Sequence, residues 1–335
     1  MKAAYLTQYG GNDMIVYGEL PAPTIEHGSV IVDVHAAGMN PVEIAMREGE
    51  FKRAIKFKFP QVMGFDISGV IRQVGPGVTH WKTGDEVFAR MPNRLIGAYA
   101  EQALVPADLL AAKPVNLTHV EAASLPTVAL TTWQGLVERA HLKAGERVLI
   151  QAGAGGVGSF AIQLARHLGA EVAATAGSAN QSFLIGLGAN IAIDYMQQRF
   201  EDFGTFDVVY DAVGGALIER SIDVLRPGGR YVGLVRTADA EAYREFGIPA
   251  PLAWLAARRV ASFQKRARAR GAQFHGILTR PDGPLLARID AMFESGAIKP
   301  VVGKVFALGQ VSQAYQEMAG GHARGKIVIQ IAAQR

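Results

Sequence analysis

The pattern of apolar and polar positions changes twice along the chain. Up to about residue 120, short β-branched stretches such as SVIVDVHAAG (29–38) and DISGVIRQV (66–74) alternate with glycine and proline turns, which is typical of a small antiparallel barrel. From Thr118 the apolar residues recur at helical spacing, and after Gly145 apolar strands alternate with helices. Strict alternation of strand and helix predicts a doubly wound parallel sheet.

The predicted strands of this sheet are RVLIQ (147–151), EVAATA (171–176), IAID (191–194), FDVVYDA (206–212) and GRYVGLV (229–235). The crossover helices between them are SFAIQLARHL, QSFLIGLG and GALIERSIDVLRPGG, each ended by glycine. The C-terminal part, beginning with the strand-like FHGILTR (274–280), is expected to fold back onto the N-terminal domain. We therefore expect two domains, residues 1–122 completed by 277–335, and residues 123–276.

Composition and charge narrow the functional classes. Of the 335 residues, 49% are hydrophobic and 19% charged, which indicates a globular protein. The absence of an apolar run suited to a secretion signal or a membrane span leads us to expect a cytoplasmic location. With 34 Lys and Arg against 30 Asp and Glu, the net charge of +4 is too small to indicate nucleic acid as a partner. The absence of cysteine excludes disulfides, thiolate nucleophiles and cysteine-based zinc sites.

The stretch AGAGGVG, which follows the first of these strands and opens a predicted helix, contains the pattern G-x-G-x-x-G. Gly153 permits the tight turn, Gly155 lets the backbone approach a pyrophosphate, and Gly158 allows close packing of helix against strand. Gly156 and Val157 lie at the helix start, where unpaired N–H groups and the positive end of the helix dipole face the phosphates. The motif in this context predicts dinucleotide binding.

The end of the second predicted strand bears on which dinucleotide binds. Thr175 and Ala176 stand where an NAD-specific protein usually places an acidic side chain on the ribose hydroxyls. Without that carboxylate a 2′-phosphate can be accommodated, and Ser178, Asn180 and Gln181 of the following loop can donate hydrogen bonds to it. NADPH is therefore the expected cofactor.

Several phrases together resemble the medium-chain dehydrogenase/reductase superfamily, and within it the zinc-independent quinone oxidoreductase branch. The resemblance covers nearly the whole chain and is carried by AAGMNPVEIAMREG (36–49), MGFDISGVI (63–71), VGPGV, AGAGGVG, LGANIAIDY (187–195), DAVGG (211–215), AIKPVVGKVFAL (297–308) and GHARGKIVI (321–329). It implies an α/β fold, with a GroES-like β-barrel domain formed by both chain ends plus an inserted Rossmann domain with a doubly wound parallel sheet. It also implies a homodimer.

The resemblance further implies roles for particular residues. Asn40 would line the active site near the nicotinamide, and Thr131 would lie close to the cofactor. Ser178 and Tyr195 would contact the 2′-phosphate, beside the loop residue Asn180.

Departures from the family pattern refine this expectation. Zinc alcohol dehydrogenases of the superfamily use a cysteine ligand and a Gly-His-Glu triplet, whereas this chain has no cysteine and reads Gly64-Phe65-Asp66, so no metal is expected. Enoyl-reductase relatives carry a proton-donating tyrosine where this chain has Phe51, which has no proton to give. Phe51 and Phe65 are instead expected to line the substrate pocket. The loop SANQ lacks the lysine common in quinone reductases, so an ionic partner for the 2′-phosphate is missing.

The expected activity is hydride transfer from NADPH to a quinone or related conjugated carbonyl without a metal, with Asn40 and Thr131 at the catalytic site. Two alternatives stay open. One is an NADPH-dependent reductase of enal or enone double bonds, and the other is a non-catalytic, NADPH-binding regulatory protein. The expected partner is a small-molecule quinone or unsaturated carbonyl.

One segment, residues 251–272, carries six basic residues and lengthens the connection after the last predicted strand. Leu252, Leu255, Val260 and Phe263 are predicted to line part of one helical face. We interpret the segment as a solvated helix packed on the sheet edge. Contact with an anionic membrane surface, or with an anionic substrate or partner, is the alternative.

Overall fold

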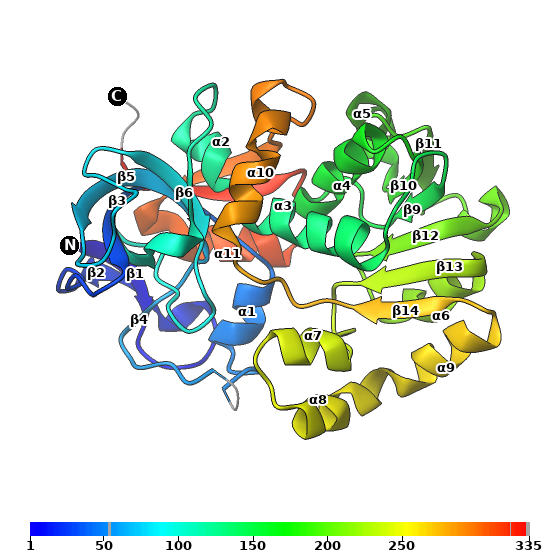
Figure 1. Ribbon diagram of the computed structural model, residues 1–335, viewed down its shortest axis with the longest axis horizontal. Helices are drawn as coiled ribbons and strands as arrows, with labels where there is room; N and C mark the ends of the chain where they lie inside the picture. The colour runs from blue at the N-terminus through cyan, green and yellow to red at the C-terminus, as the bar shows by residue number, and fades with distance from the viewer. Residues whose placement is uncertain (53–54, 322, 333–335) are drawn as a thin grey trace. The chain divides into compact units, whose positions relative to one another are not determined.

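The computed structural model describes residues 1–52, 55–321 and 323–332 and is drawn in Figure 1. The chain divides into two compact units. Unit 1 comprises Met1–Val128, Pro281–Gly296 and Pro300–Arg335, and unit 2 comprises Ala129–Arg280 and Ala297–Lys299. Both chain ends therefore belong to unit 1, and most of unit 2 is inserted between them in the sequence.

Unit 2 is built on a six-stranded parallel sheet in the order β11-β10-β9-β12-β13-β14. Its strands are β9 (Arg147–Ile150), β10 (Glu171–Ala176), β11 (Ile191–Asp194), β12 (Phe206–Asp211), β13 (Leu225–Gly233) and β14 (Gln273–Gly276). β9 and β12 are neighbours although β10 and β11 lie between them in the sequence, so the strand order reverses at this pair. In open α/β sheets, ligands bind at the carboxyl ends of the strands beside such a reversal.

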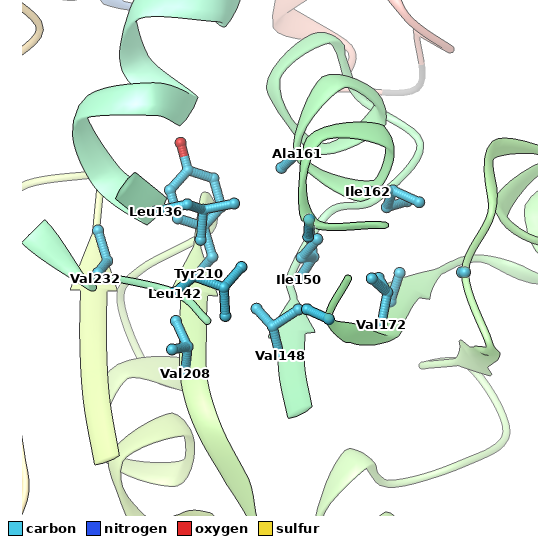
Figure 2. Close-up of a cluster of buried hydrophobic side chains, with 14 of the residues drawn as sticks. Leu136, Leu142, Val148, Ile150, Ala161, Ile162, Val172, Val208, Tyr210 and Val232 are labelled. Carbon is cyan, nitrogen blue, oxygen red and sulfur yellow. The ribbon is translucent and has the colours of Figure 1, made fainter. Parts of the chain in front are cut away.

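Apolar residues on both faces of this sheet pack against helices, because successive strand residues point to opposite faces. The helices of unit 2 are α4 (Gly156–His167), α5 (Gln181–Leu187), α6 (Leu217–Asp223), α7 (Ala240–Glu245), α8 (Ala250–Ala257) and α9 (Ala261–Ala269). Val148 and Ile150 of β9 join a core that includes residues of α4, whereas Leu149 between them joins a second core with residues of α6 and α9. Figure 2 shows the first core, with Ala161 and Ile162 of α4 above the strand residues.

Two segments of unit 2 differ from the sequence expectation. The stretch VLRPGG was predicted as a helix end, but β13 already begins at Leu225, and residues 226–229 loop out of its ladder with β12. FHGILTR was predicted to open the part that folds back onto the N-terminal domain, with the domain boundary after residue 276. Its first three residues belong to β14, the sixth strand of this sheet, and unit 2 continues beyond that boundary to Arg280. The reason is apolar packing, because Phe274 of β14 stacks on Tyr231 of β13 with ring centroids 4.8 Å apart.

The basic segment also differs from the single amphipathic helix that was predicted. It forms α8, a 3-10 turn at Arg258–Val260, and α9. Val260 is buried, whereas Leu252 and Leu255, which were predicted to lie on the same helical face, are exposed. The side of α8 that packs on the protein carries Ala253 and Ala257 instead.

Unit 1 holds two further sheets. The larger has the order β15-β16-β3-β5-β6-β8, with β7 also paired to β3, and the smaller has the order β2-β1-β4. All of these pairs are antiparallel except β15 with β16. The strands are β1 (Lys2–Leu6), β2 (Ile15–Glu19), β3 (Ser29–Gly38), β4 (Gln61–Val62), β5 (Asp66–Val74), β6 (Glu86–Arg90), β7 (Gln102–Pro106), β8 (Leu110–Ala112), β15 (Val302–Ala307) and β16 (Lys326–Gln330).

The helices of unit 1 are α1 (Val42–Arg47), α2 (His119–Ala123), α10 (Gly283–Glu294) and α11 (Val311–Ala319). α3 (Pro126–Trp133) begins in unit 1 and ends in unit 2. Its first turn is tied to β5, because the Thr127 N–H and hydroxyl both donate to Asp66 Oδ1, at 3.0 and 2.6 Å. This anchoring accounts for a unit boundary after Val128, a few residues beyond the expected 122.

Within the described part of the chain, no helix combines the length and the apolar character needed to cross a lipid bilayer.

Candidate functional site

The glycine loop joins the end of β9 to the start of α4 in unit 2. Its first residue, Ala152, has a left-handed backbone with φ of 55°, and the Gly153 N–H donates to Thr175 O of β10 at 2.8 Å. The Ala152 N–H in turn donates to the Thr175 hydroxyl at 3.3 Å. These bonds fix the loop at the carboxyl ends of two neighbouring strands, beside the reversal of strand order.

The three motif glycines meet different surroundings. A Cβ on Gly153 would stand 2.9 Å from Leu184 of α5, and a Cβ on Gly158 would stand 2.2 Å from Ala152 O. Gly158 therefore needs glycine, because the clash is with backbone, whereas at Gly153 the nearest atom is the end of a flexible side chain that can shift. A Cβ on Gly155 would meet only Ala152 O, at 3.5 Å, so the protein itself leaves room there and the need for glycine comes from elsewhere.

The first turn of α4 supplies hydrogen-bond donors beside Gly155. The first helical hydrogen bond of α4 is donated by the Ser159 N–H to the carbonyl oxygen of Gly155, at 2.9 Å. The N–H groups of Gly156, Val157 and Gly158 precede it and have no intrahelical acceptor. Open space at Gly155 together with these donors and the helix dipole fits a pyrophosphate group.

At the end of β10 the structure places a carboxylate that the sequence interpretation missed. Ser178 Oγ donates to Asp194 Oδ2 at 2.5 Å, and Met196 N–H donates to Asp194 Oδ1 at 3.0 Å. Asp194 belongs to β11 and lies opposite Ala176 in the parallel ladder. Asp194 ends the third predicted strand, and only the register between β10 and β11 brings it beside the end of the second strand.

The other predicted residues of this loop lie close to the same place. Tyr195 is 61% exposed, and its hydroxyl is 3.5 Å from the position of a Cβ on Gly177. Asn180 precedes the first residue of α5. The Gln181 amide donates to the carbonyls of Ala176 and Gly177, at 2.9 and 3.2 Å, so its donors close the loop locally.

The loop after β12 is held by a buried carboxylate. Asp211 Oδ1 accepts from the N–H groups of Val213 and Gly214, both at 2.8 Å, and Oδ2 accepts from the Tyr231 hydroxyl at 2.8 Å. The loop DAVGG is therefore fixed at the carboxyl end of β12. β12 is the neighbour of β9 at the point where the strand order reverses.

Thr131 lies in the unit 2 part of α3 and is 5% exposed. Its hydroxyl is 2.6 Å from the hydroxyl of Thr279, a residue just beyond β14. Gln134, one turn along, bonds the backbone of Arg280 through both its amide oxygen and its amide nitrogen, at 3.0 and 3.1 Å. These contacts fasten the start of unit 2 to the segment after its last strand.

Asn40 is the centre of a buried polar network in unit 1. Its Oδ1 accepts from Lys326 Nζ at 2.7 Å, and its Nδ2 donates to Asp66 Oδ2 at 3.0 Å and to Glu43 Oε1 at 3.2 Å. Lys326 also lies 3.1 Å from Asp66 Oδ2 and donates to Met39 O at 2.7 Å. Asn40 Nδ2 also lies 3.4 Å from Gly38 O, so its two shorter contacts are those with the carboxyl groups of Asp66 and Glu43.

Glu43 closes the network on its other side. Its Oε2 accepts from the hydroxyls of Tyr99 and Tyr315, at 2.5 and 2.9 Å. Complete burial raises the pKa of Glu43 to about 7, although the tyrosine and Asn40 hydrogen bonds and the Lys326 charge act in the opposite direction. Glu43 was not predicted as a site residue, but its place three residues after Asn40 in a helical stretch was the available signal.

The two predicted pocket phenylalanines have different surroundings. Phe65 is 1% exposed, and the guanidinium of Arg90 lies over its ring, 4.8 Å from the centroid. Phe51 is partly exposed and follows α1 at the edge of residues that the structure does not describe.

The stretch Gly64-Phe65-Asp66 of unit 1 does not offer zinc a site. Phe65 has no donor atom, and Asp66 Oδ1 and Oδ2 are both taken, by Thr127 and by Lys326 with Asn40. Among residues 1–52, 55–321 and 323–332, no group of three His, Cys, Asp or Glu is placed to hold a metal ion. The donor set that catalytic zinc requires is therefore missing from this part of the chain.

Two family models match the chain. Residues 26–115 match the alcohol dehydrogenase GroES-like domain, and residues 187–329 match the zinc-binding dehydrogenase family. Together these two matches include sequence from both units.

Individual relatives match over nearly the full chain. The mitochondrial NAD(P)H oxidoreductase RTN4IP1 of Danio rerio is 34% identical, over 99% of this chain and 91% of its own. The chloroplastic NADPH-dependent alkenal/one oxidoreductase of Arabidopsis thaliana is 33% identical, over 98% of this chain and 79% of its own. The structure of the quinone oxidoreductase from Coxiella burnetii has a TM-score of 0.85 and 29% identity, over 99% of each chain. With this sequence similarity, sheet order and glycine loop, the chain belongs to the medium-chain dehydrogenase/reductase superfamily, within its quinone oxidoreductase branch.

Proposed function

We propose that the protein reduces conjugated carbonyl compounds, with quinones as the principal class, by hydride transfer without a metal. The cofactor is NADPH, as in the Arabidopsis relative, and when bound it supplies hydride from C4 of its nicotinamide. The glycine loop and the first turn of α4 bind the pyrophosphate. The 2′-phosphate is proposed to lie beside Ser178, Asn180 and Tyr195, near the ends of β10 and β11, although the Ser178 hydroxyl donates to Asp194.

The observation that carries this proposal is that both carboxylate oxygens of Asp66 already have partners. Oδ1 accepts from Thr127, and Oδ2 is bound by Lys326 and Asn40. A metal reductase lowers its barrier by placing a Lewis acid on the oxygen where charge develops. Phe65 and the already paired Asp66 offer no such ion a site. A quinone or an enone has less need of a Lewis acid, because conjugation spreads the added negative charge over several atoms. The acceptor class that suits these residues is therefore a conjugated carbonyl.

The reaction balances without a further redox partner. With a quinone, addition of hydride and one proton gives the hydroquinone and NADP⁺. With an enal, hydride adds to the β carbon and a proton to the α carbon, which gives the saturated aldehyde and NADP⁺. Phe51 carries no proton to give, so we propose that the proton comes from water or from a ribose hydroxyl of the cofactor.

Asn40 and Thr131 are the residues that we propose beside the reacting groups. Asn40 Nδ2 already donates to Asp66 and Glu43, so a hydrogen bond to the acceptor oxygen requires one of these bonds to be released. Thr131 has a hydroxyl already paired with that of Thr279, and its part is to fix α3 beside the cofactor.

Reduction of enals and enones is the second candidate, and it is favoured by the names of two relatives. Besides the Arabidopsis alkenal/one oxidoreductase, the 2-methylene-furan-3-one reductase of Solanum lycopersicum is 34% identical over 98% of this chain. Both are reductases whose named substrates are unsaturated carbonyl compounds.

The test is oxidation of NADPH and NADH, followed at 340 nm, with 1,4-benzoquinone, 9,10-phenanthrenequinone and crotonaldehyde in parallel. Rapid, chelator-insensitive oxidation of NADPH by a quinone is the expected result. Turnover with crotonaldehyde alone assigns the protein to the double-bond reductases. Tight NADPH binding with no turnover in any assay contradicts both candidates and points to the non-catalytic alternative.

A further inference from the structure

The helix α8 exposes its largest apolar side chains to solvent. Leu252, Trp254 and Leu255 are 58%, 63% and 55% exposed, whereas Ala253 and Ala257 are buried. α8 is therefore apolar on its inner side and on its outer side. A helix that is apolar all round is normally covered on both sides, whereas the outer side of α8 is exposed.

The chain around this face is basic over a long stretch. No acidic residue occurs between Glu245 and Asp282. Arg266 and Arg270 of this stretch pair with Asp223 of α6, at 2.5 and 3.8 Å. Arg280 pairs with Glu138 and Glu245, at 3.0 and 3.1 Å. The other four cations of the stretch are exposed and make no ion pair with any residue of the described ranges: Arg258, Arg259, Lys265 and Arg268.

Apolar and basic side chains are also joined locally. The Arg258 guanidinium lies 5.8 Å from the centroid of the Trp254 ring. In Figure 1, α8 and the yellow helix α9 follow one another along the β14 side of unit 2. Trp and Leu ahead of a run of arginines is the side-chain combination of segments that lie in the plane of a membrane interface.

We propose that the outer face of α8, with the basic side chains that follow it, docks on an anionic lipid bilayer. Leu252, Trp254 and Leu255 enter the boundary between headgroups and acyl chains, where an indole ring is favoured. Arg258, Arg259, Lys265 and Arg268 bind the lipid phosphates. Attachment of this kind is reversible and does not require a spanning helix.

Charge argues for this occupant over a second copy of the chain. A two-fold interface centred on this face would bring the same unpaired arginines and lysine close to one another. An anionic bilayer instead offers these cations a field of phosphates and offers the apolar side chains a dry boundary.

The experiment is cosedimentation of the full chain with phosphatidylcholine vesicles that contain about 30% phosphatidylglycerol, compared with phosphatidylcholine alone. We expect binding to the anionic vesicles only, and loss of at least about tenfold in partition at about 0.5 M NaCl. The difference in tryptophan emission between the wild type and W254F should shift to the blue on binding, because the indole enters an apolar boundary.

Two variants separate the apolar and basic contributions. Trp254→Ser with Leu255→Ser, and Arg258→Glu with Arg259→Glu, should each reduce partition at least about tenfold. Matched controls are Ile185→Ser, an exposed apolar residue of α5, and Lys82→Glu with Arg94→Glu, two exposed cations of unit 1. The controls should bind as the wild type does, and circular dichroism melting shows that each variant is folded.

Several results would overturn the proposal. These are absence of binding, equal binding to neutral vesicles, or equal loss in the control variants. A dimer in sedimentation equilibrium that Trp254→Ser dissociates, without lipid binding, would assign the face to a second copy. Salt-sensitive capture by an acidic polypeptide such as polyglutamate, without vesicle binding, would assign it to an acidic protein.

Discussion

Ser178 Oγ donates a hydrogen bond to Asp194 Oδ2 at 2.5 Å, so its hydroxyl proton points at a carboxylate rather than at a 2′-phosphate. In Asp194→Asn the amide Nδ2 can donate to Ser178 Oγ, so the Ser178 hydroxyl proton becomes available to the 2′-phosphate. The substitution also removes one negative charge. NADPH should bind about fivefold more tightly, which corresponds to roughly 1 kcal/mol. NADH affinity should change less, and fluorescence titration measures both dissociation constants.

Ser178→Ala in the Asp194→Asn background is the control for this prediction. If the gain comes from the released hydroxyl, the second substitution removes most of it. Weaker NADPH binding in Asp194→Asn would mean that the carboxylate is needed to hold residues 194–196 in place, and the explanation by charge and proton direction would be wrong.

Gly155 and Gly158 should respond differently to alanine. A Cβ on Gly158 would stand 2.2 Å from Ala152 O, so Gly158→Ala should lower the free energy of unfolding by about 2–3 kcal/mol. A Cβ on Gly155 meets only Ala152 O at 3.5 Å, so Gly155→Ala should keep its thermal stability and lose at least about tenfold in NADPH affinity. Thermal melting and fluorescence titration of both variants test the pair, and destabilisation by Gly155→Ala would contradict the distinction.

Glu43 should make stability depend on pH. Burial raises its pKa from 4.5 to about 7, so the folded state holds a proton that the unfolded chain releases over that interval. The stabilisation is fully present below about pH 4.5 and is lost as the pH rises through 7, with a size of about 3 kcal/mol. Urea unfolding at pH 5 and pH 8 measures the loss.

Glu43→Gln keeps the shape and removes the titration, so its stability should change less between these two pH values than that of the wild type. Glu19→Gln, which removes an exposed carboxylate in β2, should behave as the wild type does. An unchanged difference in Glu43→Gln would place the pH dependence in other groups.

Lys326 and Asp66 should be coupled in stability. Their side chains are 7% and 0% exposed and lie 3.1 Å apart. Lys326→Met leaves the Asp66 charge buried and poorly compensated, so it should cost about 3–5 kcal/mol of unfolding free energy. The double variant Lys326→Met with Asp66→Asn should recover part of this loss, because no buried charge of the pair remains. Additive losses in a double-mutant cycle by urea unfolding would show that the pair is not coupled.

Asn40→Ala should lower kcat by about tenfold to a hundredfold and leave the NADPH dissociation constant within about twofold. The reason is that the amide is proposed to stabilise charge as hydride arrives, whereas the pyrophosphate is bound by unit 2. Steady-state kinetics with a quinone and fluorescence titration give the two values. Equal turnover in the folded variant would remove Asn40 from the catalytic site.

Much of unit 2 was predictable because its signals are local. Strands β10 and β11 have the predicted bounds, 171–176 and 191–194, since apolar runs of that length between glycine-ended helices have few other solutions. The motif glycines were predictable for the same reason, because the tight turn leaves no space for a side chain at Gly158.

Residues that act through partners far along the chain were not predictable in the same way. Asp194 was missed because its meeting with Ser178 depends on the ladder between β10 and β11. Glu43 was missed because Tyr99 and Tyr315 reach it from segments 56 and 272 residues away. The sequence of the basic segment did not reveal which side of α8 would face outward, since packing of the small residues Ala253 and Ala257 decides it.

The sequence by itself determined the order of strands and helices, the glycine loop and the absence of cysteine ligands, because each depends on residues that are neighbours in the chain. Only the tertiary structure decided which polar groups are paired and which remain available to a ligand. Burial and hydrogen bonding act between residues that the fold brings together. They set the pKa of Glu43, occupy Asp66 with a lysine, and leave Trp254 in solvent.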